Sequence, residues 1–167
     1  AAATSNTVTI AGGEIRTDAY GGYVAGDGTA ANNSLILSNG LIGLNSNGRI
    51  LYGGICGGYV SGNGTANSNT VTLNGGTAGA YVYGGCVSDN GTASSNSVIL
   101  AAVTSTSTDG EVTYTYASII GTIYGGGVGS GTASSNSVIL SGGSASAVYG
   151  GYVRGVTTVV SGNSVTI

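Results

Sequence analysis

Short segments in which apolar and polar residues alternate recur six times along the chain. Each follows the pattern Asn-x-[Val/Leu]-x-[Ile/Leu], in which two apolar positions are separated by a Thr or an Ile. Alternation with a period of two is typical of a strand that buries one face. The six predicted strands are Asn6–Ile10, Asn33–Leu37, Asn69–Leu73, Asn96–Leu100, Asn136–Leu140 and Asn163–Ile167.

The spacing of these strands defines a repeat. The gaps between successive asparagines are 27, 36, 27, 40 and 27 residues, so three gaps give a unit of 27 and two exceed it by 9 and 13. A period in this range is typical of stacked repeats, in which each unit buries its apolar face on its neighbours. We therefore predict an all-β fold, a parallel β-solenoid of about six coils with ~27 residues per coil, in one domain over residues 1–167. The alternatives are a sandwich of hairpins and a β-propeller, although a propeller blade takes about 40 residues and four strands.

A second motif, Tyr-Gly-Gly, lies between the alternating strands. It is followed by a turn rich in Gly, Asp and Asn, then by Thr-Ala and the next alternating strand, so each unit is predicted to run strand, turn, strand, turn. The two longer gaps predict inserts near residues 41–51 and 101–122 that bulge from one side of the stack. The motif begins at Tyr20, Tyr52, Tyr83, Tyr124 and Tyr149.

An asparagine at the same place in every unit predicts a column of side-chain amides. Stacked amides can donate and accept hydrogen bonds along the stack, although each asparagine could instead cap only its own turn. Aligned tyrosines predict an aromatic stack in the same way, in which each pair contributes about 0.5–1.5 kcal/mol. The predicted ladder consists of Asn6, Asn33, Asn69, Asn96, Asn136 and Asn163, and the predicted stack of Tyr20, Tyr83, Tyr124 and Tyr149.

The two cysteines, Cys56 and Cys86, admit two alignments. If Tyr52 is aligned with Tyr83, Cys56 lies one residue from the position opposite Cys86, and a disulfide fits the Cα separation limit of about 7 Å. If Cys56 is aligned with Tyr20 instead, Cys86 lies three residues away along the strand, which is too far. A disulfide is therefore left open, and no metal site is expected, because two thiols without a histidine are too few ligands.

Composition excludes several classes of function. The chain has no His and no Lys, which excludes catalytic triads, Cys-His pairs and Schiff-base lysines, so we expect neither an enzyme nor a cofactor. Three arginines without a basic cluster argue against nucleic acid as a partner. No apolar stretch approaches the ~18–20 residues of a membrane-spanning helix, so no membrane insertion is expected. The low charge and the many Ser, Thr, Asn, Gly and Tyr residues favour a secreted or cell-surface protein.

The wording of the repeat is similar to that of a known class of proteins. Val-Tyr-Gly-Gly-Tyr-Val-x-Gly-x-Gly-Thr-Ala-x-x-Asn-x-Val-x-Leu-x-Gly-Gly resembles repeats in the passenger regions of bacterial autotransporter-like surface proteins, and the resemblance covers nearly the whole chain. It is clearest in Val82–Gly85, Gly58–Leu73 and Val148–Val153. The resemblance implies an exported β-solenoid that holds binding surfaces away from the cell, in adhesion or aggregation. It carries over no catalytic residues.

Two non-enzymatic functions follow as expectations. The first is a surface adhesin whose partner is the surface of a host or neighbouring cell. Its candidate contact loop is the second insert, because functional contacts concentrate in loops. The second is a filament subunit whose partner is itself, because the chain starts and stops in equivalent strands that could stack head to tail. The candidate loop residues are Asp109, Glu111, Tyr114 and Tyr116.

Overall fold

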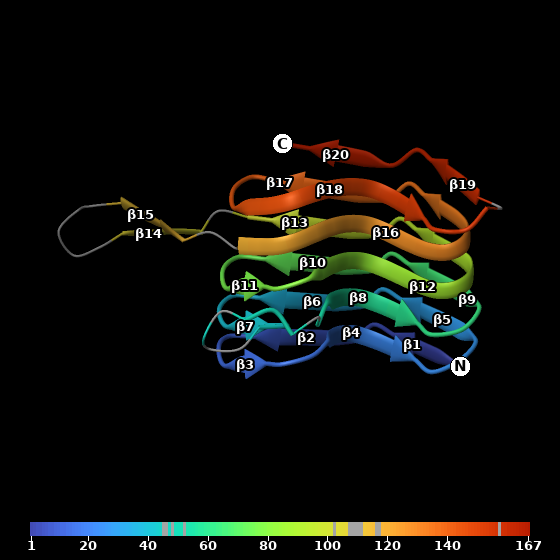
Figure 1. Ribbon diagram of the computed structural model, residues 1–167, viewed down its shortest axis with the longest axis horizontal. Helices are drawn as coiled ribbons and strands as arrows, with labels where there is room; N and C mark the ends of the chain where they lie inside the picture. Colours follow the sequence, from blue (N-terminus) through green and yellow to red (C-terminus); the bar gives the residue numbers. More distant parts are fainter. Residues whose placement is uncertain are drawn as a thin grey trace.

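The fold is a stack of strands without helices. The computed structural model describes residues 1–44, 47, 49–51, 53–101, 103–106, 112–115, 118–156 and 158–167, with the backbone alone at 103–106, 112–115, 118 and 120. Over these residues the chain forms only strands, turns and bends. Nearly all strands pair in parallel with the equivalent strand of the neighbouring repeat, one above the other (Figure 1). This all-β architecture of stacked parallel strands is consistent with a β-solenoid.

The six alternating strands form one parallel sheet. Its order, β2-β6-β10-β13-β17-β20, follows the order of the repeats along the chain. Equivalent residues pair directly, so that Val71 lies beside Leu35 on one side and Val98 on the other. The strands are β2 (Thr7–Ile10), β6 (Ser34–Leu37), β10 (Thr70–Leu73), β13 (Ser97–Leu100), β17 (Ser137–Leu140) and β20 (Ser164–Thr166).

A second sheet of 12 strands covers the other sides of the stack. Two long strands, β12 (Tyr81–Ser94) and β16 (Ser118–Ser134), span it and pair with several shorter strands one after another. Both long strands carry Tyr-Gly-Gly, and the shorter strands that carry it or its equivalent are β4 (Ala19–Val24), β8 (Ile55–Val60) and β18 (Ser144–Val153). The strands before the asparagines are β1 (Ala2–Thr4), β5 (Gly28–Ala31), β9 (Gly64–Asn67) and β19 (Thr158–Ser161). The shortest are β3 (Glu14–Ile15), β7 (Leu41–Ile42) and β11 (Thr77–Ala78).

Apolar side chains fill the stack in two clusters. The larger cluster contains both apolar columns of the alternating strands, where Leu35, Val71 and Val98 are fully buried. The smaller cluster joins Ala30, Ala66 and their equivalents to the valines that follow Tyr-Gly-Gly. The apolar columns become exposed at the final strand, where Val165 is 42% exposed, because no further described repeat covers it. Each repeat therefore depends on its neighbours for burial.

Both inserts are shorter than the sequence predicted, which is a correction. Leu41–Ile42 was assigned to the first insert, but these residues form β7 and pair with β3 and β11 inside the stack. Ser118–Thr122 was assigned to the second, but it begins β16 and pairs with the preceding repeat. The error arose because these short paired segments share no residue pattern. What leaves the stack in the second insert is an antiparallel hairpin of β14 (Val103–Thr106) and β15 (Val112–Thr115), seen at the left of Figure 1.

A left-handed corner precedes every repeat asparagine. The residue before it has a positive φ in all six repeats, between 53° and 62°. Five of the six corner residues are Ser or Asn, which reach this region at a cost in energy. The sharp bend ends one strand and starts the next at the asparagine. The corner residues are Ser5, Asn32, Ser68, Ser95, Ser135 and Gly162.

Candidate functional site

The structure places all six predicted ladder asparagines in one hydrogen-bonded column. The side-chain amide nitrogen of each donates to the side-chain oxygen of the next, from Asn6 to Asn163, at 2.8–3.0 Å. The backbone N–H of each asparagine donates to the same oxygen, at 2.9–3.1 Å. The column is continuous, and all its bonds run in one direction.

Each inner asparagine uses its full hydrogen-bonding capacity. The amide nitrogen has a second proton, and in Asn69 that proton is donated to the carbonyl of Ala30 at 2.9 Å. The same bond recurs in Asn33, Asn96, Asn136 and Asn163. The four inner asparagines are no more than 1% exposed. A buried amide is costly only when it lacks partners, so these bonds make a polar column compatible with an apolar core.

The glycines of Tyr-Gly-Gly make room for the ladder. A Cβ atom added to the second glycine would come within 2.4–2.5 Å of the neighbouring asparagine side chain, as at Gly22 on Asn33 and Gly85 on Asn96. A Cβ on the first glycine would meet the backbone carbonyl of the adjacent repeat, at 2.4 Å for Gly84. The motif is therefore required by close packing of the Tyr-Gly-Gly strand against the ladder.

The first tyrosine column is interrupted, which corrects the predicted stack. In register, the column reads Tyr20, Cys56, Tyr83, Tyr124, Tyr149. The rings of Tyr83, Tyr124 and Tyr149 stack with centroids 4.7 and 5.4 Å apart and planes within 11°. Tyr20 is separated from them by Cys56 and contacts Tyr59 instead, at 5.2 Å. Burial raises the pKa of Tyr83 above its usual range, since the phenolate would be poorly solvated.

A second outward column lies three residues further along the strands. It reads Tyr23, Tyr59, Cys86, Gly127, Tyr152. The rings of Tyr23 and Tyr59 stack at 5.5 Å with planes 13° apart. Two successive positions then carry no aromatic ring, and the column resumes at Tyr152, whose centroid lies 5.0 Å from that of Tyr124.

Both cysteines are free thiols in the structure. The register aligns Cys56 with Tyr20, so Cys86 lies on the next strand three residues further along. The two side chains nevertheless interact. The contact with the Cys86 thiol and burial raise the pKa of the Cys56 thiol well above its usual range. The observed register is the alignment in which the two residues are too far apart for a disulfide, and the structure forms none between them.

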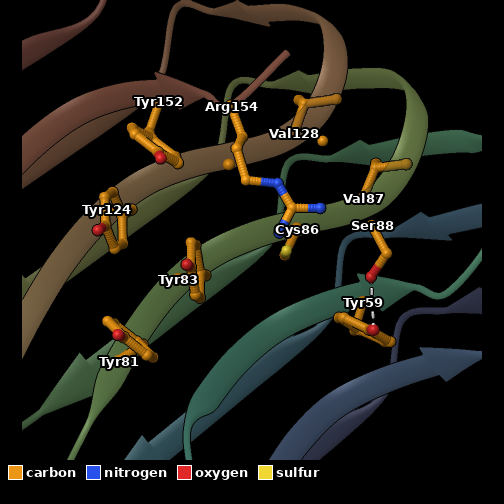
Figure 2. A pocket seen from close by; sticks show the side chains of 12 residues that line it. Tyr59, Tyr81, Tyr83, Cys86, Val87, Ser88, Tyr124, Val128, Tyr152 and Arg154 are labelled. Atoms are coloured by element: carbon orange, nitrogen blue, oxygen red, sulfur yellow. Dashed lines mark hydrogen bonds between the residues drawn. The ribbon is translucent and has the colours of Figure 1, made fainter.

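The interruption of the second tyrosine column coincides with a groove of about 440 Å³. Tyr83 and Tyr124 line one side, Tyr59 and Tyr152 line the ends, and Gly127 contributes no side chain (Figure 2). The guanidinium of Arg154 extends across it toward Cys86. At the Tyr59 end, the Tyr59 and Ser88 hydroxyls form a hydrogen bond of 2.5 Å. The groove therefore combines aromatic rings, a hydrogen-bonded pair of hydroxyls and one cation.

The predicted contact loop is only partly described. Asp109, Glu111 and Tyr116 lie outside the described residues, and Tyr114 lies in β15, of which only the backbone is described. The two strands that flank this loop, β14 and β15, project away from the stack (Figure 1).

Searches for a metal site and for a membrane-spanning helix in the described part of the chain, and for similar proteins, all give negative results. Among the described residues, no group of three or more His, Cys, Asp or Glu side chains is placed to hold a metal ion. Within the same residues, no helix is long and apolar enough to cross a membrane. Comparison of the chain with protein-family models, with curated proteins and with solved structures gives no match. The groove is therefore interpreted from its own chemistry.

Sequence reasoning missed the groove and the second tyrosine column. Tyr23, Tyr59 and Tyr152 were visible in the sequence as residues that follow the glycine pair. Counting back from each repeat asparagine would not have aligned Tyr152 with the others, because Val128 pairs with Val153 but Gly131 pairs with Thr158, so the last repeat is longer at this point. The signal that could have revealed the groove is the replacement of a recurrent Tyr by Cys86 and Gly127 in successive repeats.

Proposed function

We propose that the chain is a six-coil parallel β-solenoid that serves a non-enzymatic, structural and adhesive role on the outside of a cell. The observation that carries this proposal is the asparagine ladder, in which one buried hydrogen-bonded column links all six repeats. A structure joined repeat by repeat in this way is suited to act as a rigid support.

Other features support the adhesive part of the proposal. The hairpin of β14 and β15 and the tyrosine-lined groove both lie on the sides of the stack, where a partner can reach them. The repeat resembles those of autotransporter-like passenger regions, which implies adhesion or aggregation. The low charge and the absence of His and Lys favour an extracellular binding surface over an acid–base catalyst.

Cell adhesion tests this function directly. Beads coated with the folded chain are incubated with bacterial and animal cells, and beads coated with the urea-unfolded chain at equal density are the control. We expect the folded chain to retain cells, or to make the beads aggregate, well above the control. Retention and aggregation no greater than the control on every cell type would contradict an adhesive function.

A second candidate function is a filament in which copies of the chain stack end to end. The specific observation in its favour is the direction of the ladder. At one end, the side-chain oxygen of Asn6 accepts no hydrogen bond from the described residues. At the other, the backbone N–H of Asn163 and the amide proton that it does not donate to Ala133 find no ladder acceptor among the described residues. These ends are complementary, so the last repeat of one copy could donate to the first repeat of the next.

Sedimentation velocity over a range of concentrations measures this association, and a monomer at every concentration would argue against it.

A further inference from the structure

The groove exists because two aromatic rings are missing from an otherwise regular column. Tyr59 on β8 and Tyr152 on β18 lie three strands apart in the stack, which corresponds to a separation of about 14 Å. Between them stand Cys86 and Gly127. The Tyr83 ring lies against Gly127, where an added Cβ would meet it at 2.7 Å, and the small Cys86 side chain does not fill the position beside it. A cavity of about 440 Å³ lies in the range of small-ligand sites. The gap therefore has room for one ring of a bound ligand.

The walls of the groove favour a ring with apolar faces. Tyr83 and Tyr124 are held by stacking on each other at 4.7 Å, and Tyr152 is tilted by 46° against Tyr124. Rings fixed in this way need little ordering when a ligand binds. The face of an aromatic ring is negative, so it attracts the weakly positive C–H groups on the flat face of a pyranose sugar.

The polar groups of the groove favour a carboxylate on that ring. Arg154 extends over the opening, and no acidic partner for it is found among the described residues. Arginine binds carboxylates through two parallel hydrogen bonds, a geometry that a neutral hydroxyl does not match. The bonded hydroxyls of Tyr59 and Ser88 can still donate or accept one bond to a sugar hydroxyl.

Other ligand classes fit the groove less well. A peptide commonly docks by adding a strand to a free sheet edge, but β12 and β16 are paired with neighbouring strands on both sides. Nucleic acid needs several cations, whereas the chain carries a net charge of −3 and the groove holds a single arginine.

We propose that this groove binds a carboxylated pyranose, the uronate unit of an acidic polysaccharide. The ring lies between Tyr59 and Tyr152 against the face of Tyr83 that is not stacked on Tyr124, and its carboxylate pairs with Arg154. The inference deepens the proposed adhesive function and rests on it, because it names the class of surface molecule that the stack would hold.

Isothermal titration calorimetry of the full chain tests the proposal. The probes are tetramers of galacturonic acid and of mannuronic acid, together with their methyl esters, which remove the charge and keep the rings. We expect at least one acidic tetramer to bind and its ester to bind at least about tenfold more weakly. If neither acidic tetramer binds, or if the ester binds equally well, the proposal is overturned.

Two variants place the binding in the groove. Cys86→Tyr restores the tyrosine at one interrupted position, so it should fill the groove and abolish binding while circular dichroism and the melting temperature show a folded chain. Arg154→Gln should weaken binding of the acidic tetramer at least about tenfold and leave the ester unaffected. Arg16→Gln is the matched control, because Arg16 pairs with Glu14 outside the groove and should be replaceable without effect. Wild-type affinity in both groove variants would place the site elsewhere and overturn the proposal.

Bead adhesion separates this inference from the function on which it rests. Cells that adhere to the wild-type chain and no longer adhere to Cys86→Tyr support uronate binding as the adhesive contact. Equal adhesion to Cys86→Tyr, in a chain that binds no acidic tetramer, overturns the groove proposal and leaves the adhesive function standing.

Discussion

At the scale of the residue, the repeat is explained by an asparagine and a glycine that pack against each other. The asparagine is retained because its amide can donate two and accept two hydrogen bonds in a column where water is absent. The glycine opposite is retained because any side chain there would occupy the space of that amide. Each residue therefore constrains the other across the core, and the stability of the stack should depend on both.

Removing an inner asparagine should be costly. Asn96→Ala would leave the donors of Asn69 and the carbonyl of Ala66 without their present partners. Because each buried unsatisfied group costs about 1–3 kcal/mol, we expect a loss of about 3 kcal/mol or more in the free energy of unfolding, measured by urea denaturation. Asn6→Ala is the matched control at the exposed end and should cost less than about 1 kcal/mol. Equal losses in the two variants would argue against a cooperative buried ladder.

The glycine opposite the ladder gives a second prediction. In Gly85→Ala the new Cβ would lie 2.4 Å from the Asn96 side-chain oxygen, so the ladder must shift. We expect a loss of about 2 kcal/mol or more in the free energy of unfolding. Gly12→Ala is the control, since nothing lies within 4 Å of a Cβ placed there, and its stability should stay close to that of the wild type. A Gly85→Ala chain as stable as the control would show that the close packing described here is wrong.

At the scale of the element, the alternating pattern predicted the strands of one sheet well and those of the other poorly. β2, β6, β10, β13, β17 and β20 all lie within predicted segments, because burial on one face leaves a period of two in the sequence. The short strands β3, β7 and β11 leave no such pattern. They are fixed by pairing with neighbouring repeats, which no single segment encodes. For the same reason the sequence left two alignments of Cys56 open, and the register decides for the one in which Cys56 interrupts the tyrosine stack.

The hairpin of β14 and β15 should be dispensable for folding. Residues 101–117 can be replaced by the turn Asn74-Gly75-Gly76 of the preceding repeat, which connects the equivalent strands β10 and β11. Since the length of a surface loop changes its closure entropy only slowly, we expect the free energy of unfolding to change by less than about 1 kcal/mol. Loss of cooperative unfolding would show that the hairpin is part of the core. In the adhesion assay, unchanged cell binding would count against the loop of Asp109 and Glu111 as the contact site.

At the scale of the whole molecule, the stack has a direction and two different ends. One end offers ladder acceptors and the other offers ladder donors, and each carries the edge strands of two sheets. Exposed sheet edges readily pair with other strands, and a charged side chain on an edge opposes such pairing. The chain has few charges to do so, so the end-to-end association proposed above would meet little charge repulsion at these edges.

Association through the ends can be tested with one pair of variants. Thr166→Arg places a charge on the edge strand β20, whereas Thr72→Arg places the same charge in the same column within the central strand β10. If the ends stack, Thr166→Arg should lower the sedimentation coefficient at high concentration to that of a monomer, and Thr72→Arg should sediment like the wild type. Equal behaviour of all three chains would exclude stacking through this edge.

One buried amide column joins the repeats, and hydrogen exchange of the asparagine side-chain amides, followed by NMR, tests this most directly. We predict that the side-chain amide protons of Asn33, Asn69, Asn96 and Asn136 exchange at least about a thousandfold more slowly than those of the exposed Asn39. Exchange of all five at the same fast rate would contradict the ladder, and with it the account of how this chain is held together.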